Sequence, residues 1–192
     1  YIGETGRMKK FLKEALETSI YLLVVLVISL LVVTFVGQRT VVDGESMEET
    51  LYNGDNLIVD KISYRFREPE RFDVIVFPFH YDTKMYYVKR IIGLPGETVY
   101  IDEAGNIYIN DELLEEDFGK EVILHAGRAE QKITLMDDEY FVLGDNRNNS
   151  SDSRDYMVGN IKRDEIIGSE IVIIITLPPI SILFATELSP ES

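Results

Sequence analysis

The sequence predicts a mostly β, antiparallel domain with a small β-rich appendage, preceded by one N-terminal transmembrane helix. Three observations lead to this prediction: one uncharged apolar run of membrane length, several short apolar segments between turn signals, and one acidic stretch with little periodicity. The predicted organisation is a cytoplasmic segment at 1–17, a membrane anchor at 18–36 and an extracytoplasmic domain at 37–192, with the appendage at approximately 103–136.

The apolar run at 18–36 contains no charge and no proline. A helix needs about 20 such residues to cross the hydrocarbon layer of a membrane, so this run is just long enough. No Ala-x-Ala cleavage pattern follows it, which favours a retained anchor over a removed signal sequence. Four basic residues precede the run, namely Arg7, Lys9, Lys10 and Lys13. By the positive-inside rule they predict a cytoplasmic N-terminus and a single-pass protein of the cell membrane.

Composition excludes several classes of function. The chain has 34 acidic and 19 basic residues, a net charge of −15, which argues against a nucleic-acid partner because phosphate binding needs a cationic surface. It has no cysteine, so disulfides, thiol catalysis and cysteine metal ligands are excluded. Two isolated histidines and dispersed carboxylates give little support for a metal site, and we expect neither a metal nor another cofactor.

The β prediction depends on seven short segments rich in β-branched and aromatic residues, each bounded by turn-forming residues. A hairpin is expected at 100–110, with Gly105 and Asn106 in its turn because both residues tolerate positive φ. The predicted strands are 56–60, 72–77, 85–92, 98–101, 106–109, 139–143 and 170–176.

A serine and a lysine stand in local contexts that suit hydrolytic chemistry. Ser46 lies in the segment 44–47, Gly-Glu-Ser-Met, and Lys89 lies in the apolar stretch 86–93. A serine hydroxyl is a weak nucleophile until a base removes its proton, and a lysine can be that base if burial lowers its pKa. Both residues also have a plainer interpretation, since a serine beside glycine is commonly a turn residue and a strand lysine commonly faces solvent.

The third candidate segment is the polar loop at 144–155, which follows an apolar strand ending at Leu143. Its asparagine, serine and aspartate content is typical of a surface loop. It is nevertheless denser in hydrogen-bonding groups than a connection requires. Such a loop could supply a hydroxyl to a lysine and an Asp–Arg pair that braces the fold.

With these segments together, the chain resembles the bacterial type I signal peptidases, membrane-bound Ser/Lys endopeptidases that remove signal peptides from exported preproteins. The most specific matches are the Lys-Arg-x-x-Gly-x-Pro-Gly run at 89–96 and the Gly-Asp-Asn-Arg-x-Asn-Ser-x-Asp-Ser-Arg run at 144–154. Weaker matches lie at 46–51 and 71–77. The resemblance implies a signal-peptidase-like catalytic domain, preproteins and the lipid bilayer as partners, and the protein export machinery as a candidate partner.

The resemblance also implies a role for each matching residue. Ser46 would be the acylating nucleophile and Lys89 the general base, while Ser150 would hydrogen-bond and orient the lysine amine. Asp152 and Arg154 would form an ion pair that holds the site together. The backbone N–H of Ser46 would donate in the oxyanion hole, where loss of one donor costs about 10²–10³ in rate.

Four positions depart from the family pattern. Some members carry a serine hydroxyl where this chain has Gly44, so its oxyanion hole would depend on backbone or water. Proline is usual at Glu49, glycine is usual at Phe72, and aspartate is frequent at Asn148. None of these changes removes a proposed catalytic group, and they bear on loop geometry and substrate preference.

The implied substrate is an extended peptide with small residues at the first (P1) and third (P3) positions before the scissile bond. It could pair with backbone beside Ser46 and Lys89 as an added strand. The plainer interpretation of the pocket residues is ordinary core, especially for Leu51. The matching positions that would line shallow apolar pockets are Val42, Met47, Leu51, Tyr87 and Val88.

Alternatives from other classes stay open at this point. A Ser–His hydrolase would use His80 or His125, the two histidines of the chain. An anchored β domain could bind peptides without cutting them, and a relative specialised for one substrate has the same sequence features. Self-cleaving repressors share the Ser/Lys chemistry, but they are cytosolic, so the predicted membrane span argues against them.

Overall fold

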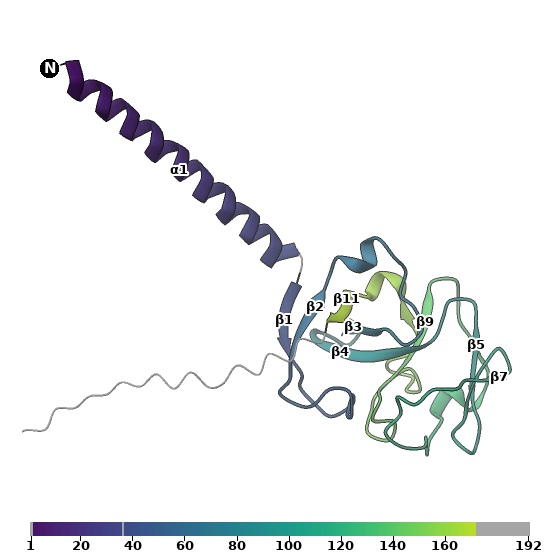
Figure 1. Ribbon diagram of the computed structural model, residues 1–192. Helices are drawn as coiled ribbons and strands as arrows, with labels where there is room; N and C mark the ends of the chain where they lie inside the picture. The colour runs from purple at the N-terminus through teal and green to yellow at the C-terminus, as the bar shows by residue number, and fades with distance from the viewer. Residues whose placement is uncertain (1, 36, 172–192) are drawn as a thin grey trace, which may run out of the picture.

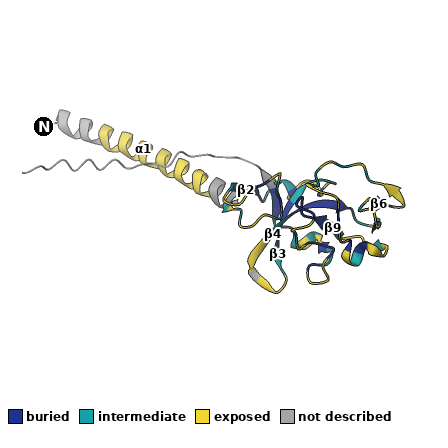
Figure 2. Cartoon of the chain, turned by 90° about the horizontal axis from the view of Figure 1, so that it is seen from below, coloured by how far each residue is buried: buried dark blue, intermediate teal, exposed yellow. Residues whose placement is uncertain are grey.

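The computed structural model describes residues 2–35 and 37–171. Helix α1 (Ile2–Phe35) extends away from a β-rich body (Figure 1). Its side chains from residue 10 to 30 are exposed (Figure 2). By length and hydropathy together, none of the helices in the described part meets the requirement for crossing a membrane. The predicted anchor at 18–36 falls on α1, except for residue 36, which lies outside the described residues.

The larger sheet has seven antiparallel strands and confirms the predicted mostly antiparallel β domain. Strand β4 is long and lies between β3 and β9, and the β4–β9 register shifts between Ile91 and Gly93. In spatial order the strands are β1 (Gly37–Val41), β2 (Asn56–Asp60), β11 (Gly168–Ile171), β3 (Val74–Phe79), β4 (Asp82–Gly93), β9 (Glu139–Leu143) and β10 (Ile161–Lys162).

The second sheet has four short antiparallel strands, β7 (Glu112–Leu113), β6 (Ile107–Ile109), β5 (Thr98–Ile101) and β8 (Ile133–Thr134). The predicted hairpin is formed by β5 and β6. In its turn the Asp102 carboxylate accepts from the N–H groups of Ala104 and Asn106, and Gly105 has a φ of +83°. This sheet starts at Thr98, before residue 103, the expected start of the appendage.

The other predicted strands fall close to the observed ones. The segments 56–60, 98–101 and 139–143 match β2, β5 and β9 in both bounds. Strand β3 lies two residues later than 72–77, β4 is longer than 85–92, and β6 starts one residue after 106. Strand β11 starts at Gly168 instead of residue 170, and residues 172–176 lie outside the described part. Short 3-10 helices cover Ser63–Arg65, Gly127–Glu130 and Arg163–Glu165.

Strand alternation divides the buried apolar side chains of the body into two main groups. Ile92 and Phe141 pack with residues of the second sheet, whereas their neighbours Ile91 and Val142 pack on the opposite face of the large sheet. A third, smaller group contains Met47, Leu51 and Leu57. Met47 and Leu51 belong to the loop that carries Ser46, and their packing against Leu57 of β2 fixes that loop to the sheet.

Candidate active site

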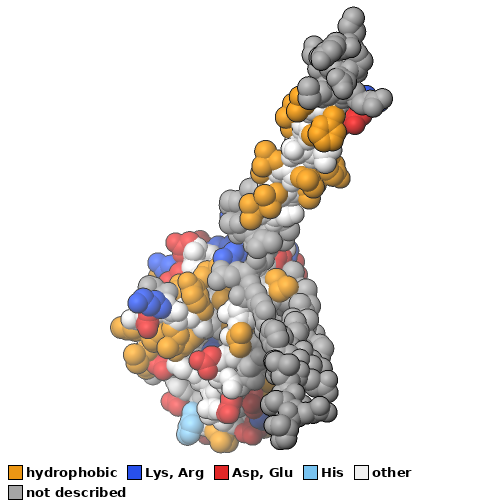
Figure 3. Space-filling model, turned by 90° about the vertical axis from the view of Figure 1, so that its left-hand side faces the viewer, with side chains coloured by type: hydrophobic (Ala, Val, Ile, Leu, Met, Phe, Trp, Pro, Cys, Tyr) orange, Lys and Arg blue, Asp and Glu red, His pale blue; other side chains and the backbone are white. Residues whose placement is uncertain are grey.

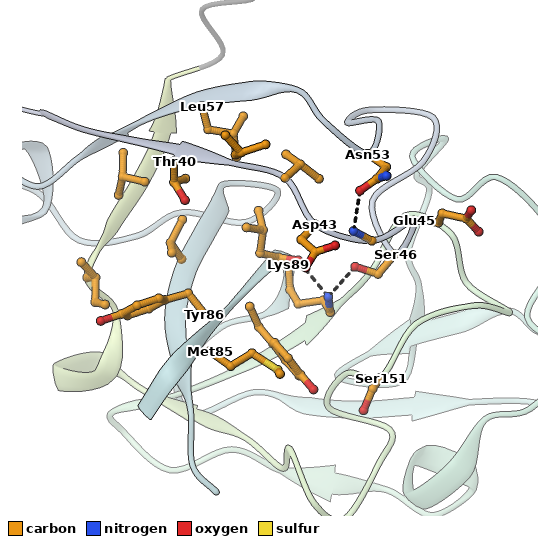
Figure 4. A pocket seen from close by; sticks show the side chains of 18 of the residues that line it. Thr40, Asp43, Glu45, Ser46, Asn53, Leu57, Met85, Tyr86, Lys89 and Ser151 are labelled. Atoms are coloured by element: carbon orange, nitrogen blue, oxygen red, sulfur yellow. Dashed lines mark hydrogen bonds between the residues drawn. The ribbon is translucent and has the colours of Figure 1, made fainter. Parts of the chain in front are cut away.

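Ser46 and Lys89 lie next to each other although 43 residues separate them in sequence. The Lys89 Nζ atom is 2.7 Å from Ser46 Oγ and donates to the Val88 carbonyl at 2.9 Å. A neutral amine has two hydrogens and one lone pair, so it can donate to Val88 and still accept the hydroxyl proton. The pair therefore has the geometry of a nucleophile and its base. Figure 4 shows the lysine side chain reaching toward the serine.

Lys89 lies in a strongly desolvated position on the central strand β4, where it is 3% exposed. Burial disfavours the ammonium form and lowers the pKa of Lys89 to about 8, although the charges of Asp152 and Asp145 act in the opposite direction. The Tyr87 ring centroid lies 5.1 Å from the amine. The amine is therefore neutral in a useful fraction of molecules at neutral pH.

The nucleophile loop connects β1 to β2 and is closed by backbone hydrogen bonds between Val42 and the segment 54–55. Gly44 has a φ of +112°, a conformation that favours glycine, and its N–H donates to Asn53 Oδ1 at 3.0 Å. Apart from its two neighbours in the chain, no described residue has an atom within 4 Å of where a Cβ would stand on Gly44. The loop thus leaves open space beside Ser46.

A second loop, 144–154, packs against the nucleophile loop. The Asn146 backbone N–H donates to the Ser46 carbonyl, and the Asn146 side-chain Nδ2 donates to the Glu45 carbonyl, both at 3.1 Å. Gly144 is needed where the loops meet, because a Cβ there would overlap the Ser46 carbonyl oxygen and the Ser150 hydroxyl. Sequence reasoning did not single out Asn146, whose contacts depend on the approach of the two loops.

A buried ion pair fixes the start of this second loop. Arg90 Nε and Nη2 donate to the two Asp145 carboxylate oxygens at 2.9 and 2.6 Å. Arg90 also donates to the Phe72 carbonyl at 3.0 Å and to Thr50 Oγ1 at 3.1 Å, and it lies 4.0 Å from the Phe118 ring centroid. Sequence reasoning missed this pair, although Arg90 follows the lysine directly and Asp145 is one of the motif residues.

Asp152 and Arg154 form an ion pair, with Arg154 Nε donating to Asp152 Oδ1 at 2.8 Å. Asp152 also accepts from the Gly144 N–H at 3.1 Å. The Ser150 hydroxyl is buried and has no hydrogen-bond partner among the described residues. The expected hydrogen bond from Ser150 to Lys89 is therefore not made in this structure, where the lysine amine bonds to Ser46 and Val88 instead.

A groove of about 930 Å³ passes over the Ser–Lys pair (Figure 4). Val42, Tyr87 and Val88 line it, as does Gly44. Met47 and Leu51 do not line it, because they pack behind the nucleophile loop against Leu57. Residues of the groove that sequence reasoning missed include Asp43, Asn53, Met85, Tyr86, Asn149 and Ser151.

The two histidines lie outside this groove. His80 Nδ1 is 3.2 Å from Glu165 Oε1, and the His125 carbonyl accepts from Arg154. The structure therefore does not favour a Ser–His pair at Ser46. No group of three or more histidine and acidic side chains that could hold a metal ion occurs within residues 2–35 and 37–171.

Phe72 and Asn148, two of the four positions that depart from the pattern of the resembled family, make specific local contacts. Phe72 has a φ of +72°, which favours the glycine usual at this position, and its ring centroid lies 5.0 Å from that of Phe118. Asn148 Nδ2 donates to the Glu121 carboxylate and to the Val122 carbonyl, which ties the loop to the segment after the second-sheet hairpin. Glu49 is exposed, and the peptide bond before it is cis.

Comparison with known proteins identifies the family of this chain. The family model described as signal peptidase, peptidase S26, matches residues 15–175. Probable signal peptidase I-2 from Synechocystis sp. is 34% identical over 208 aligned residues, which cover 100% of this chain and 91% of that protein. Signal peptidase I from Leptolyngbya laminosa is 40% identical over 153 residues, covering 76% and 72%.

A crystal structure of a signal peptidase I from Enterococcus faecalis V583 has 34% sequence identity and a TM-score of 0.45, and the match covers 54% of this chain and 97% of that chain. The family match spans both motif runs and every residue of the Ser–Lys site. This chain therefore belongs to the signal peptidase family, peptidase S26, and is a type I signal peptidase.

Proposed function

We propose that the chain is a membrane-anchored serine endopeptidase that removes N-terminal signal peptides from exported preproteins by a Ser46/Lys89 dyad. The observation that carries the proposal is the 2.7 Å separation of Lys89 Nζ and Ser46 Oγ, with the amine buried. The relatives named signal peptidase I support the substrate class.

In the proposed reaction, Ser46 Oγ attacks the carbonyl carbon of the scissile peptide bond while its proton passes to the neutral Lys89 amine. The lysine then protonates the leaving amine, and an acyl-enzyme on Ser46 remains. A water molecule, deprotonated by the same lysine, hydrolyses this ester and releases the signal peptide. The Ser46 N–H would stabilise the oxyanion of both tetrahedral intermediates.

Lowering the pKa of Lys89 makes this chemistry feasible at neutral pH. With a pKa of about 8, roughly a tenth of the amine is neutral at pH 7. An exposed lysine with a pKa of 10.5 would be neutral in about one molecule in 3,000. The supporting residues Asp152 and Arg154 would act by holding the 144–154 loop against the dyad. Ser150 would orient the amine by taking the place of the Val88 carbonyl, while the contact of the amine with Ser46 is kept.

The substrate would lie extended in the groove, paired with the backbone beside Ser46 and along β4. Val42, Tyr87 and Val88 line the groove with apolar surface and would form the P1 and P3 pockets. Met47 and Leu51 would support these pockets from behind, since Val42 and Val88 pack on the same buried group. Shallow pockets of this kind would select small side chains.

Residues 18–36 would anchor the enzyme, with the N-terminus in the cytoplasm and the β domain outside. The support is the uncharged run and the basic residues before it, and Figure 3 places apolar side chains along the described part of α1. Anchoring would raise the local concentration of the site for substrates that are themselves held in the lipid bilayer. The export machinery, which delivers such substrates, is a candidate partner.

Preprotein cleavage by the detergent-solubilised chain tests the dyad. Ser46→Ala and Lys89→Ala should each reduce cleavage by at least about 10³-fold. His80→Ala and His125→Ala should retain activity, and a strong chelator should have no effect. Retained activity in Lys89→Ala with loss in a histidine variant would refute the dyad, and no cleavage by the wild type would favour a binding module.

The anchor is tested with single cysteines, since the chain contains none. A membrane-impermeant maleimide should label Asn106→Cys in intact cells and Thr5→Cys only after permeabilisation. Release of the wild type from membranes by alkaline carbonate would contradict the anchor.

A further inference from the structure

Asn146 contacts the backbone on both sides of the nucleophile, and the roles described so far do not use it. Its side-chain Nδ2 donates to the Glu45 carbonyl, and its own N–H donates to the Ser46 carbonyl. The residue is 7% exposed and is not part of the groove lining. A carbonyl oxygen can only accept, so the amide nitrogen and not the amide oxygen must face Glu45.

The contact with Glu45 fixes the direction of the Ser46 N–H. The Glu45 carbonyl and the Ser46 N–H belong to one planar trans peptide group, in which they point in opposite directions. Holding the carbonyl toward Asn146 therefore turns the N–H away from Asn146, which does not line the groove, whereas Gly44, Glu45 and Ser46 do. The Ser46 N–H makes no hydrogen bond with another residue in the described part of the chain, so it remains a free donor.

Asn146 is itself held rigidly, which a positioning residue requires. The preceding residue, Asp145, is 0% exposed and paired with Arg90. The following turn is closed by the Asn149 N–H, which donates to the Asn146 carbonyl at 3.0 Å. The close approach of Gly144 to the Ser46 carbonyl leaves the two loops little freedom to slide.

We propose that Asn146 is a positioning residue that orients the Ser46 N–H as the oxyanion donor by holding the Glu45–Ser46 peptide group. The inference rests on the proposed role of Ser46 as nucleophile. An oxyanion donor acts only if it is aimed at the developing negative charge, and a misplacement of about 1 Å can cost about 10²-fold in rate. Asn146 would thus stabilise the transition state without touching the substrate.

The test compares wild type with Asn146→Ala on a signal-peptide substrate. We expect kcat to fall about 10- to 100-fold with KM within about threefold. The pH at which activity is half-maximal should not change, because Asn146 carries no charge. Asn146→Asp keeps the size of the side chain and the backbone donor but turns an acceptor toward the Glu45 carbonyl, so its kcat should fall at least as much. This variant replaces Asn146→Ala in the test if the alanine variant does not fold.

A peptide aldehyde separates orientation of the donor from general damage. Ser46 Oγ adds to the aldehyde carbon, its proton passes to Lys89, and the former carbonyl oxygen takes the oxyanion position as an alkoxide. The inhibition constant of the aldehyde should rise at least about tenfold in Asn146→Ala, while that of the matching peptide alcohol stays within about twofold. Asn160→Ala is the matched control, since it also removes one partly buried side-chain donor, to Glu139, away from the groove. It should leave both constants unchanged.

Two results would overturn the inference: near wild-type kcat in both Asn146 variants, or an equal rise of both inhibition constants. Its failure is distinguishable from failure of the proposed function. If Ser46→Ala is inactive while the Asn146 variants are fully active, this inference alone fails. If Ser46→Ala cleaves normally, the dyad fails first.

Discussion

Replacement of Lys89 by methionine tests whether burial sets the pKa of the proposed base. The lysine is 3% exposed, and its pKa falls from 10.5 to about 8. One pKa unit corresponds to about 1.4 kcal/mol, so folding with a charged lysine at neutral pH costs about 3 kcal/mol. Methionine has a similar length and no charge, so the variant avoids this cost.

The cost of burying Lys89 to the free energy of unfolding decreases as the pH rises. Because the folded pKa lies below the unfolded one, the unfolded chain binds more protons between about pH 8 and 10.5, and the wild type gains stability as the pH rises through this window. The penalty is fully present below about pH 8. The stability advantage of Lys89→Met should therefore be about 2 kcal/mol larger at pH 7 than at pH 10. Lys89→Met also loses the contacts with Ser46 and Val88. The effect of this loss on the free energy of unfolding changes little with pH, so it cancels when pH 7 is compared with pH 10.

Urea unfolding of both proteins in non-ionic detergent, followed by far-ultraviolet circular dichroism, measures this difference. Lys120→Met is the matched control, because Lys120 is exposed and the Glu48 carboxylate raises its pKa. For Lys120→Met, the free energy of unfolding relative to wild type should not show the decrease from pH 7 to pH 10 that is expected for Lys89→Met. A stability difference between Lys89→Met and wild type that stays constant from pH 7 to pH 10 would refute the reasoning, because the amine would then titrate alike in the folded and unfolded chains.

Three further predictions follow from the site and its surroundings. In wild type, kcat/KM should rise about tenfold per pH unit up to about pH 8 and then level off, because only the neutral amine of Lys89 accepts the proton of the Ser46 hydroxyl. The measurement is the rate of product release from pH 6 to pH 9. A kcat/KM that does not change over this range would contradict the prediction. Asp145→Asn leaves the buried Arg90 guanidinium without its carboxylate and should lower the free energy of unfolding by about 3–5 kcal/mol in urea titrations, whereas a loss below about 1 kcal/mol would indicate an unimportant pair. Phe72→Gly should be more stable than Phe72→Ala by about 1 kcal/mol, the reverse of the usual order, because both lose the ring but only glycine accepts a φ of +72° without strain; equal urea midpoints would disprove the strain.

The sequence predicted the fold where local patterns decide structure. The segments 56–60, 98–101 and 139–143 are short apolar runs between turn residues, and they match observed strands in both bounds. Strand β1 (Gly37–Val41) was not predicted, because it has little apolar pattern and exists through its pairing with β2. Pairing of this kind depends on residues far along the chain, which local patterns do not contain.

The site was predictable as a set of residues, but not as a set of contacts. Resemblance and local context placed Ser46 and Lys89 in one site, and their 2.7 Å separation agrees with that prediction. The assignment of Met47 and Leu51 to the pocket surface did not anticipate that the nucleophile loop turns both side chains inward. Asn146 was missed because its partners are two backbone carbonyls about 100 residues away, and backbone groups leave no trace in a sequence pattern.

The register of β4 decides which of the two neighbouring basic residues, Lys89 or Arg90, lies next to Ser46. Side chains alternate along a strand, so sliding β4 by one residue against β3 and β9 would turn Lys89 to the opposite face of the sheet, and one direction of the slip would bring Arg90 to its place. A guanidinium does not release its proton in proteins and could not serve Ser46 as a base. The correct pairing of β4 with β3 and β9 is therefore required for enzymatic activity. A perturbation that shifts this pairing would abolish activity although both residues of the dyad are still present.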